Sequence, residues 1–265
     1  MLPSSIWVML LVSAAICAIG FYKFVYFLSV GYGFAVCGMG IAILILYGNT
    51  VTPITIIMCL LLMAYGARLG GFLVWREVKS LSYRKTLTEA TTTKKPMPMF
   101  VKSAIWICCS IMYVLQISPI FYRSVNGDNG NIFAVIGVVI MFVAIIIESL
   151  SDHQKSSAKA KNPRRFCDTG LFKIVRCPNY LGEVLFWTGV LVSGIGVIEG
   201  TQWIIAILGY ILIVYVMLSG AKRLEIRQNK NYGQDPEYQA YVAKTPIIFP
   251  LVPLYHLENV KFIIV

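Results

Sequence analysis

Seven long apolar stretches divide this sequence, and they constrain its fold more than any other feature. They cover residues 4–22, 25–48, 52–75, 100–121, 131–149, 181–198 and 202–220. A helix rises about 1.5 Å per residue, so each stretch is close to the ~20 residues that cross the hydrocarbon core of a bilayer. The sequence therefore predicts an all-α integral membrane protein with seven transmembrane helices.

The composition agrees with a chain that lies mostly in lipid. Hydrophobic residues make up 58% of the 265 residues, and charged residues make up 13%. Average soluble domains are about 45–50% apolar and about 25% charged, so an ordinary soluble protein and a disordered chain are both excluded. We expect a single membrane domain over residues 1–265, with three spans in residues 1–75 and four in residues 99–265.

The positive charge lies on one side of the predicted membrane. Of the 23 Lys and Arg residues, 19 fall in residues 76–95, 155–176 and 222–261, which follow the third, fifth and seventh stretches. Cytoplasmic loops carry the excess of Lys and Arg, which predicts an N-terminus outside and a C-terminus in the cytosol. Lys23 follows the first stretch and does not precede it, so we interpret that stretch as an uncleaved anchor.

The expected setting is a multi-pass protein of a bacterial inner membrane or of the endoplasmic reticulum. Membrane lipids are the expected partners, and no nucleic-acid partner is expected. The seven cysteines form no CxxC pair and five lie in apolar stretches, which is typical of small buried side chains rather than disulfides. The two histidines are too few and too scattered to indicate a metal site.

Polar side chains at the ends of the spans are the candidate functional groups, since ionisable residues inside a membrane are costly. Tyr65 and Arg68 are one helical turn apart, although packing between helices and snorkelling to the interface also explain them. Pro178 suits the first turn of a helix. Asn179 and Glu183 are spaced to share one face of that helix, where a capping role is the alternative.

Two further groups lie beside the basic segments. Glu148 and Asp152 are four residues apart at the end of the fifth stretch, either as a solvated helix end or directed towards the basic segment that follows. Tyr238 and Tyr241 follow the last span, and such tyrosines either stack on a planar ligand or lie along the membrane interface. Residues 91–99 are predicted to form a connecting loop.

The C-terminal half carries short motifs in a fixed order. They are Gly170-Leu171-Phe172, Arg176, Pro178-Asn179-Tyr180, Gly182-Glu183, Trp187 with Gly189, Glu225, Tyr238 with Tyr241, and Pro250. With these motifs the chain resembles the membrane-bound steroid 5α-reductase family, especially its bacterial branch of unassigned function. The resemblance covers roughly residues 60–255 and includes Arg68-Leu69 with Arg76. It also implies seven spans with a cytosolic C-terminus.

The resemblance implies an NADPH-dependent oxidoreductase that reduces an activated C=C bond in a hydrophobic lipid or steroid-like substrate entering from the bilayer. It places Asn179 and Glu183, within a motif that includes Tyr180, at the nicotinamide end of the cofactor. The residues that it implies for the phosphates, ribose and adenine are Asp152, Arg164, Arg165, Arg223 and Tyr238, and Glu225 belongs to the same cofactor-binding part. Tyr65 falls where a family tyrosine donates a hydrogen bond to the substrate carbonyl.

Physical chemistry is consistent with this assignment. NADPH carries a pyrophosphate and a 2′-phosphate, which Arg and Lys bind well. A phenol on the carbonyl would stabilise the developing enolate, and the cofactor supplies the hydride. Two features depart from the family pattern. Cys177 replaces the usual His before Pro178, and no Asp or Glu precedes Glu77, although steroid-reducing members pair that tyrosine with an acid.

Two other interpretations remain open at this stage. Membrane isoprenylcysteine and phospholipid methyltransferases have a similar tail, but they bind S-adenosylmethionine, which has no phosphates to occupy the basic segments. They also favour a glutamate pair where this chain has Glu225 alone. A lipid-binding protein without catalytic activity is the second alternative.

Overall fold

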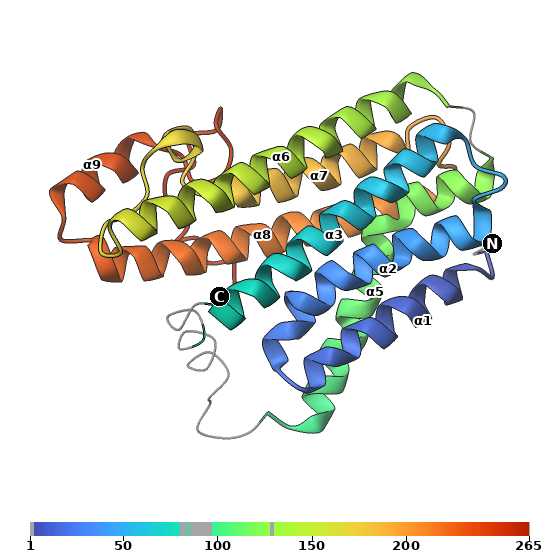
Figure 1. Ribbon diagram of the computed structural model, residues 1–265, viewed down its shortest axis with the longest axis horizontal. Helices are drawn as coiled ribbons and strands as arrows, with labels where there is room; N and C mark the ends of the chain where they lie inside the picture. Colours follow the sequence, from blue (N-terminus) through green and yellow to red (C-terminus); the bar gives the residue numbers. More distant parts are fainter. Residues whose placement is uncertain (1–2, 80–83, 85–96, 128–129, 265) are drawn as a thin grey trace. The chain divides into compact units, whose positions relative to one another are not determined.

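A computed structural model describes residues 3–79, 84, 97–127 and 130–264, and this part of the chain is helical, with no β-strand (Figure 1). Its α-helices are α1 (Ile6–Cys17), α2 (Val30–Tyr47), α3 (Pro53–Lys79), α5 (Met99–Asn126), α6 (Ile132–Lys161), α7 (Pro178–Ser193), α8 (Gln202–Tyr232) and α9 (Pro236–Lys244). Short 3₁₀ helices are η1 (Ala18–Phe21), η2 (Phe24–Leu28) and η3 (Gly170–Lys173). The predicted all-α class is confirmed.

Within the described residues, five helices are long and apolar enough to cross a membrane. They are α2, α3, α5, α6 and α8. The first predicted span corresponds to a shorter apolar helix, the run Ile6–Phe21 formed by α1 with η1. The sixth corresponds to α7, which has 16 residues. Five such helices are compatible with a multi-pass membrane protein that contacts lipids.

The chain forms two compact units, and α6, α7 and α8 contribute residues to both. The first unit contains residues 1–138 and 190–209, and the second contains residues 139–189 and 210–265. In the first unit, α2 packs against α1, α3 and α5 (Figure 1). In the second, Gly182 of α7 packs against Ala144 and Glu148 of α6, and Gly220 of α8 packs against the Tyr180 ring.

Small residues allow the closest of these approaches. A Cβ atom on Gly33 of α2 would lie 2.7 Å from the backbone nitrogen of Gly70 and 2.8 Å from the carbonyl oxygen of Gly66, both on α3. Gly66 and Gly70 are four residues apart, a spacing that lets two membrane helices bring their backbones together. The α2–α3 contact is therefore a backbone-to-backbone contact that a larger residue would prevent.

Several helix ends differ from the predicted span ends. The helices α6 and α8 continue to Lys161 and Tyr232 because helices extend beyond the apolar stretch wherever polar residues with adequate helix propensity follow. The helix α7 ends at Ser193, before the predicted residue 198, since Gly194 and Gly196 form a turn in which Gly196 has φ +83°. The side-chain amide of Asn131 donates to the carbonyl of Ile195 in this turn (2.8 Å).

Part of the predicted basic segment at 76–95 and of the predicted loop at 91–99 lies outside the described residues. Each of the seven cysteines is free, and Cys17, Cys59, Cys109, Cys167 and Cys177 are buried. That state agrees with the prediction of small buried side chains for these five, whereas Cys37 is partly buried and Cys108 is exposed.

Candidate functional site

The motif that starts α7 is held in place by the chain that follows α9. Pro178 is the first residue of α7, as predicted. The two residues before it donate backbone hydrogen bonds to this later segment, from Arg176 N–H to the Pro246 carbonyl and from Cys177 N–H to the Ile247 carbonyl, both at 2.9 Å. Residues 246 onward therefore fix the entry into α7, where the candidate binding residues lie.

Arg176 and Glu225 form a buried ion pair in the second unit. Nη2 of Arg176 lies 2.9 Å from Oε1 of Glu225, and their side chains are 1% and 0% exposed. Burying two charges costs roughly several kcal/mol per ion, unless further hydrogen bonds to the charged groups offset this cost. The stability of this ion pair therefore depends on the other hydrogen bonds that the Glu225 carboxylate accepts.

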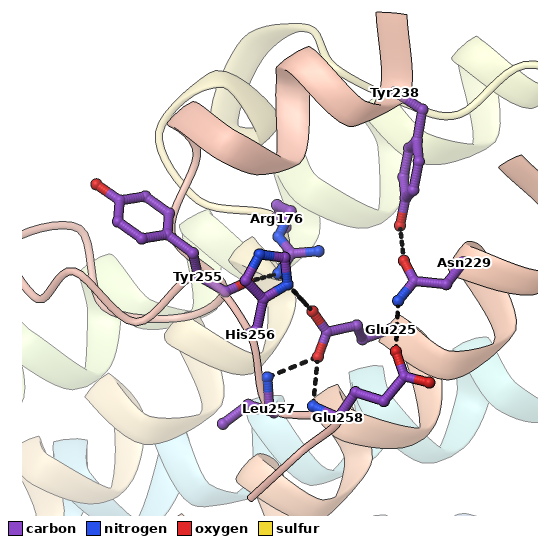
Figure 2. Close-up of polar contacts among 8 residues, drawn as sticks. All are labelled: Arg176, Glu225, Asn229, Tyr238, Tyr255, His256, Leu257 and Glu258. Carbon is purple, nitrogen blue, oxygen red and sulfur yellow. Dashed lines mark hydrogen bonds and ion pairs between the residues drawn. The ribbon is translucent and has the colours of Figure 1, made fainter. Parts of the chain in front are cut away.

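The C-terminal tail, residues 246–264, supplies these hydrogen bonds. Oε2 of Glu225 accepts from the backbone N–H groups of Leu257 (2.7 Å) and Glu258 (3.0 Å). Nη2 of Arg176 also donates to the Tyr255 carbonyl, and Nδ1 of His256 lies 3.3 Å from Oε1 of Glu225. Figure 2 shows the tail crossing Glu225, with the Tyr255 ring directed away from the network.

A second chain of contacts links α9, α8 and the tail. The Tyr238 hydroxyl donates to Oδ1 of Asn229 (2.9 Å), and Nδ2 of Asn229 donates to Oε2 of Glu258 (2.7 Å; Figure 2). One turn before Glu225, Nζ of Lys222 donates to the carbonyls of Val260 (2.8 Å) and Ile263 (3.1 Å). Glu225 and Tyr238, both predicted as cofactor residues, thus have partners within the chain.

Asn179 retains an unused acceptor. Within the described part of the chain, its Oδ1 atom is buried and accepts no hydrogen bond. Glu183, one turn further along α7, is 5% exposed and accepts from Nε1 of Trp187 at 3.2 Å. The described residues also leave Nε and Nη1 of Arg176 without a hydrogen bond, although both atoms are buried. Such unsatisfied buried groups are uncommon and call for an explanation.

A cavity of about 350 Å³ lies between the start of α7 and α8. It is lined by Tyr180, Gly220, Arg223, Leu224 and Arg227. Tyr180 and Arg223 were predicted as binding residues, and Arg227 was not. Arg223 and Arg227 are four residues apart on α8, so their guanidinium groups project from the same face towards this cavity. A cavity with two arginines and a phenol suits an anionic ligand with a planar or hydroxylated part.

The predicted tyrosine pair, Tyr238 and Tyr241, packs within an aromatic cluster. Phe166 contacts Tyr238 edge-on at 5.3 Å between ring centroids and stacks on Tyr241 at 5.4 Å. Tyr232 joins the same cluster. Burial raises the pKa of Tyr238 to about 12, with the Arg176 charge acting in the opposite direction. Burial also raises the pKa of Tyr241, so both phenols stay neutral at physiological pH. The Tyr241 hydroxyl donates to the Phe172 carbonyl (2.7 Å), which ties α9 to η3.

The remaining predicted cofactor residues lie at the end of α6 and after it. Arg165 is exposed and forms ion pairs with Asp168 (2.9 Å) and Glu237, and these partners raise its pKa. Arg164 is exposed, and Asp152 lies on α6 partly buried. The second unit thus contains Asp152, Arg164, Arg165, Asn179, Tyr180, Glu183, Arg223, Glu225 and Tyr238, every residue that was predicted to bind the cofactor.

Tyr65, predicted to act on the substrate, lies in the first unit. It is fully buried on α3, and its hydroxyl lies 2.9 Å from that of Tyr32 on α2. Tyr32 was not singled out from the sequence, because nothing in a single apolar stretch indicates which residue faces the neighbouring helix.

Comparison with known protein families gives one match. Residues 18–245 match the family described as "Protein of unknown function (DUF1295)". The chain belongs to this family. Searches of curated proteins and of solved structures gave no match. The family description assigns no activity to its members, so the function has to be argued from the residues described above.

Sequence reasoning missed three contributors to the second unit. Arg176 was noted only as a motif residue, Arg227 was not noted as a ligand-binding residue, and the tail at 255–258 was not recognised as a structural part. A basic residue four positions from a predicted binding arginine is a signal that could have found Arg227. The pairing of Arg176 with Glu225 joins residues 49 positions apart and has no local signal.

Proposed function

We propose that this protein is an integral membrane reductase that uses NADPH to reduce an activated C=C bond in a hydrophobic lipid or steroid-like substrate. In this proposal, α1 with η1, and α7, are spans as well, which gives seven spans with the N-terminus outside and the C-terminus in the cytosol. The distribution of Lys and Arg supports this orientation, since 19 of 23 fall on the proposed cytosolic side.

One observation carries the proposal more than any other. The unused Oδ1 of Asn179 and the two-arginine cavity beside Tyr180 occur on α7 and α8, in the part of the chain whose motifs resemble the reductases. A nicotinamide carboxamide offers an N–H₂ donor that suits a free amide oxygen. The phosphates of NADPH suit Arg223 and Arg227.

The roles of the other residues follow from their chemistry. In the proposed reaction, NADPH supplies a hydride to the β-carbon of a conjugated carbonyl compound. The electron pair of the C=C bond moves onto the carbonyl oxygen, where Tyr65 donates a hydrogen bond to the developing enolate. Uptake of one proton at the α-carbon completes the reaction. NADPH, a proton and the enone thus give NADP⁺ and the saturated ketone.

Cofactor binding is the first test. We would purify the whole protein in a non-ionic detergent and titrate NADPH, NADH and S-adenosylmethionine by thermal shift. The expected result is a saturable shift with NADPH that is at least about tenfold weaker in Asn179→Ala, a loss on the scale of one hydrogen bond to a charged or polar ligand group. The control Asn259→Ala removes an exposed asparagine of the tail and should leave the shift unchanged.

The alternatives predict different results. A shift with S-adenosylmethionine alone would replace the reductase with a methyltransferase. No shift with any of the three compounds would favour the lipid-binding protein without catalytic activity. If NADPH binds, NADPH deuterated at the transferred position should place deuterium at the β-carbon of a reduced enone, which mass spectrometry detects.

A further inference from the structure

The last described residues of the C-terminal tail run back along α8. The Tyr215 hydroxyl on α8 accepts from the backbone N–H of Ile264 (3.1 Å) and donates to the Phe262 carbonyl (3.2 Å). One turn further along α8, the Ser219 hydroxyl donates to the Ile264 carbonyl. Side chains of α8 therefore hold backbone groups at the end of the tail.

These contacts reach into the apolar part of α8, one of the helices that are long and apolar enough to cross a membrane. Tyr215 lies within the apolar stretch 202–220, and the first charged residue after that stretch is Lys222. A helix rises about 1.5 Å per residue, so Tyr215 lies about 10 Å from Lys222 along the axis, towards the middle of the stretch. The interfacial layer on each side of a bilayer is only about 5–8 Å thick. The residues bonded to Tyr215 therefore lie below the charged boundary of this helix.

The side chains at the end of the tail divide into an inner and an outer set. Ile263 is 2% exposed and belongs to the same core cluster as Ala221 and Leu224 of α8. Phe262 and Ile264, on either side of it, are 72% and 73% exposed. Lipid offers no hydrogen bonds to peptide groups, so a segment in lipid needs its backbone groups bonded within the protein and apolar side chains facing outward. The end of the tail meets both requirements.

The surface around this segment has the pattern of a membrane boundary. Ile211 lies one turn before Tyr215 on the same face of α8 and is 56% exposed. Lys261 directly precedes Phe262 and is exposed. A lysine next to inserted apolar side chains extends its ammonium group to anionic head groups. The exposed apolar face of α8 thus continues into the end of the tail, with a positive charge beside it.

We propose that residues 260–264 are a C-terminal anchor, which lies on α8 at the boundary of the bilayer and inserts the side chains of Phe262 and Ile264 among the acyl chains of phospholipids. In the orientation proposed above, the anchor occupies the cytosolic leaflet. Its partner is the lipid surface itself, and the anchor requires neither a cofactor nor a substrate.

The anchor also acts on the buried ion pair. Leu257 and Glu258 directly precede it and donate their backbone N–H groups to Oε2 of Glu225. Between these residues and the inserted side chains, the Val260 carbonyl accepts from Nζ of Lys222 (2.8 Å). Insertion of the anchor into lipid therefore keeps this part of the tail on Glu225. Loss of insertion should release both N–H groups and allow them to exchange with water.

Photo-crosslinking in a bilayer tests where the anchor lies. Full-length protein that carries the photoreactive residue p-benzoylphenylalanine at position 262 is reconstituted into vesicles of phosphatidylcholine and phosphatidylglycerol. After illumination, mass spectrometry of the C-terminal peptide measures phospholipid adducts. We expect about ten times the yield of a control probe, because acyl chains surround an inserted side chain.

The control places the same probe at position 240. Ala240 is exposed on α9. Tyr238 of that helix donates to Asn229, which lies about 10 Å beyond Lys222 along α8, on the side away from the apolar stretch. A probe on α9 should therefore meet water and give few phospholipid adducts.

Hydrogen exchange in the same vesicles tests the link to Glu225. Phe262→Asp places a carboxylate where the proposal has acyl chains, so the peptide containing Leu257 and Glu258 should exchange about tenfold faster. Phe262→Leu keeps an apolar side chain and is the matched control, with exchange unchanged. Both measurements are made without NADPH and without turnover, so they are independent of the reductase function.

Three results would overturn the C-terminal anchor. Equal phospholipid yields at positions 262 and 240 would place the end of the tail in water. Adducts between two copies of the chain, in place of phospholipid adducts, would make this segment an interface between copies. Exchange in Phe262→Asp as slow as in the unmodified protein would show that Phe262 does not hold the tail through lipid. Crosslinking keeps Asp out of the chain, so it decides the position of the anchor even where Phe262→Asp fails to fold.

Discussion

Two contacts between helices use opposite chemistry for buried polar groups. At the α2–α3 contact, glycines bring the backbones together and the buried polar pair is two neutral phenols, Tyr32 and Tyr65. At the contact of α7, α8 and the tail, the buried pair is Arg176 with Glu225, and both are charged. Burying the neutral phenols at the first contact costs little desolvation free energy. The ion pair at the second contact has a larger desolvation cost, which additional hydrogen bonds offset.

The difference between the neutral and the charged pair matches the two ligands of the proposed reductase. A neutral pair suits a hydrophobic substrate that brings only one carbonyl oxygen into the membrane. Charged groups suit an anionic, water-soluble ligand, and the arginine-lined cavity lies in the same unit as the buried ion pair. The comparison therefore predicts that the two contacts respond differently to substitution.

The largest expected effect comes from breaking the buried ion pair. Glu225→Ala leaves Arg176 charged and buried, together with the unsatisfied N–H groups of Leu257 and Glu258. Removing one partner of a buried pair costs about 3–5 kcal/mol, so the midpoint of thermal unfolding in detergent should fall steeply. The matched control is Arg165→Ala, which removes an exposed arginine with two carboxylate partners and should leave the midpoint unchanged. Equal changes in the unfolding midpoint for Glu225→Ala and Arg165→Ala would contradict the distinction between a buried and an exposed ion pair.

The α2–α3 contact should respond to added volume rather than to lost charge. Gly33→Ala places a methyl group against the backbone of Gly66 and Gly70, and overpacking of this kind costs about 1–3 kcal/mol. Gly71→Ala is the matched control, because a Cβ there meets nothing within 4 Å. Alanine also has the better helix propensity, so this control should be neutral or stabilising. Thermal unfolding in detergent distinguishes the two, and a destabilising Gly71→Ala would argue against the backbone contact as the cause.

The cavity arginines should affect ligand affinity more than stability. Arg223→Ala and Arg227→Ala should each weaken NADPH binding about tenfold, equivalent to about 1.4 kcal/mol, and added salt should reduce the difference from the unmodified protein. Lys230→Ala removes an exposed charge on the same helix outside the cavity and serves as the control. If Lys230→Ala weakens binding as much, net charge rather than the cavity determines the affinity.

The smallest expected effect is the loss of a single neutral hydrogen bond. Tyr238→Phe removes the bond from the Tyr238 hydroxyl to Asn229 and should cost about 1 kcal/mol. The pKa of Tyr238 is raised to about 12, above the value of about 10 in an unfolded chain, so its contribution is present below pH 10 and is lost as the pH rises to 12. Unfolding midpoints measured across this range should therefore fall less in Tyr238→Phe. An identical decline in both proteins would assign the pH dependence to other groups.

Part of this structure could be predicted from the sequence because its causes are local. Among the described residues, apolar stretches predicted the five long helices α2, α3, α5, α6 and α8, and Pro178 marked the start of α7. Helix ends were less accurate because hydropathy reports where a helix enters lipid, whereas α6 and α8 continue through polar residues. The turn after Ser193 depends on Gly196 and on the amide of Asn131, a residue 64 positions earlier than its partner.

The candidate site was predictable only where one helix carries it. Asn179 and Glu183 share a face of α7 because their spacing is local. By contrast, Tyr32 meets Tyr65 only because two helices pack in one register, and Glu225 meets Leu257 only because the tail folds back. Such contacts depend on tertiary structure, and their residues give no periodic signal.

The returning tail has a consequence for the order in which the protein is built. Arg176 and Glu225 are synthesised before residues 255–258, which supply the backbone groups that complete their hydrogen bonding. During translation the helices can enter the membrane while this charged pair is still incomplete. A chain stopped at residue 253 would contain α1 to α9 as described above and yet leave the Glu225 carboxylate without two of its donors. The Arg176–Glu225 pair therefore reaches its full set of hydrogen bonds only after residues 255–258 have been translated.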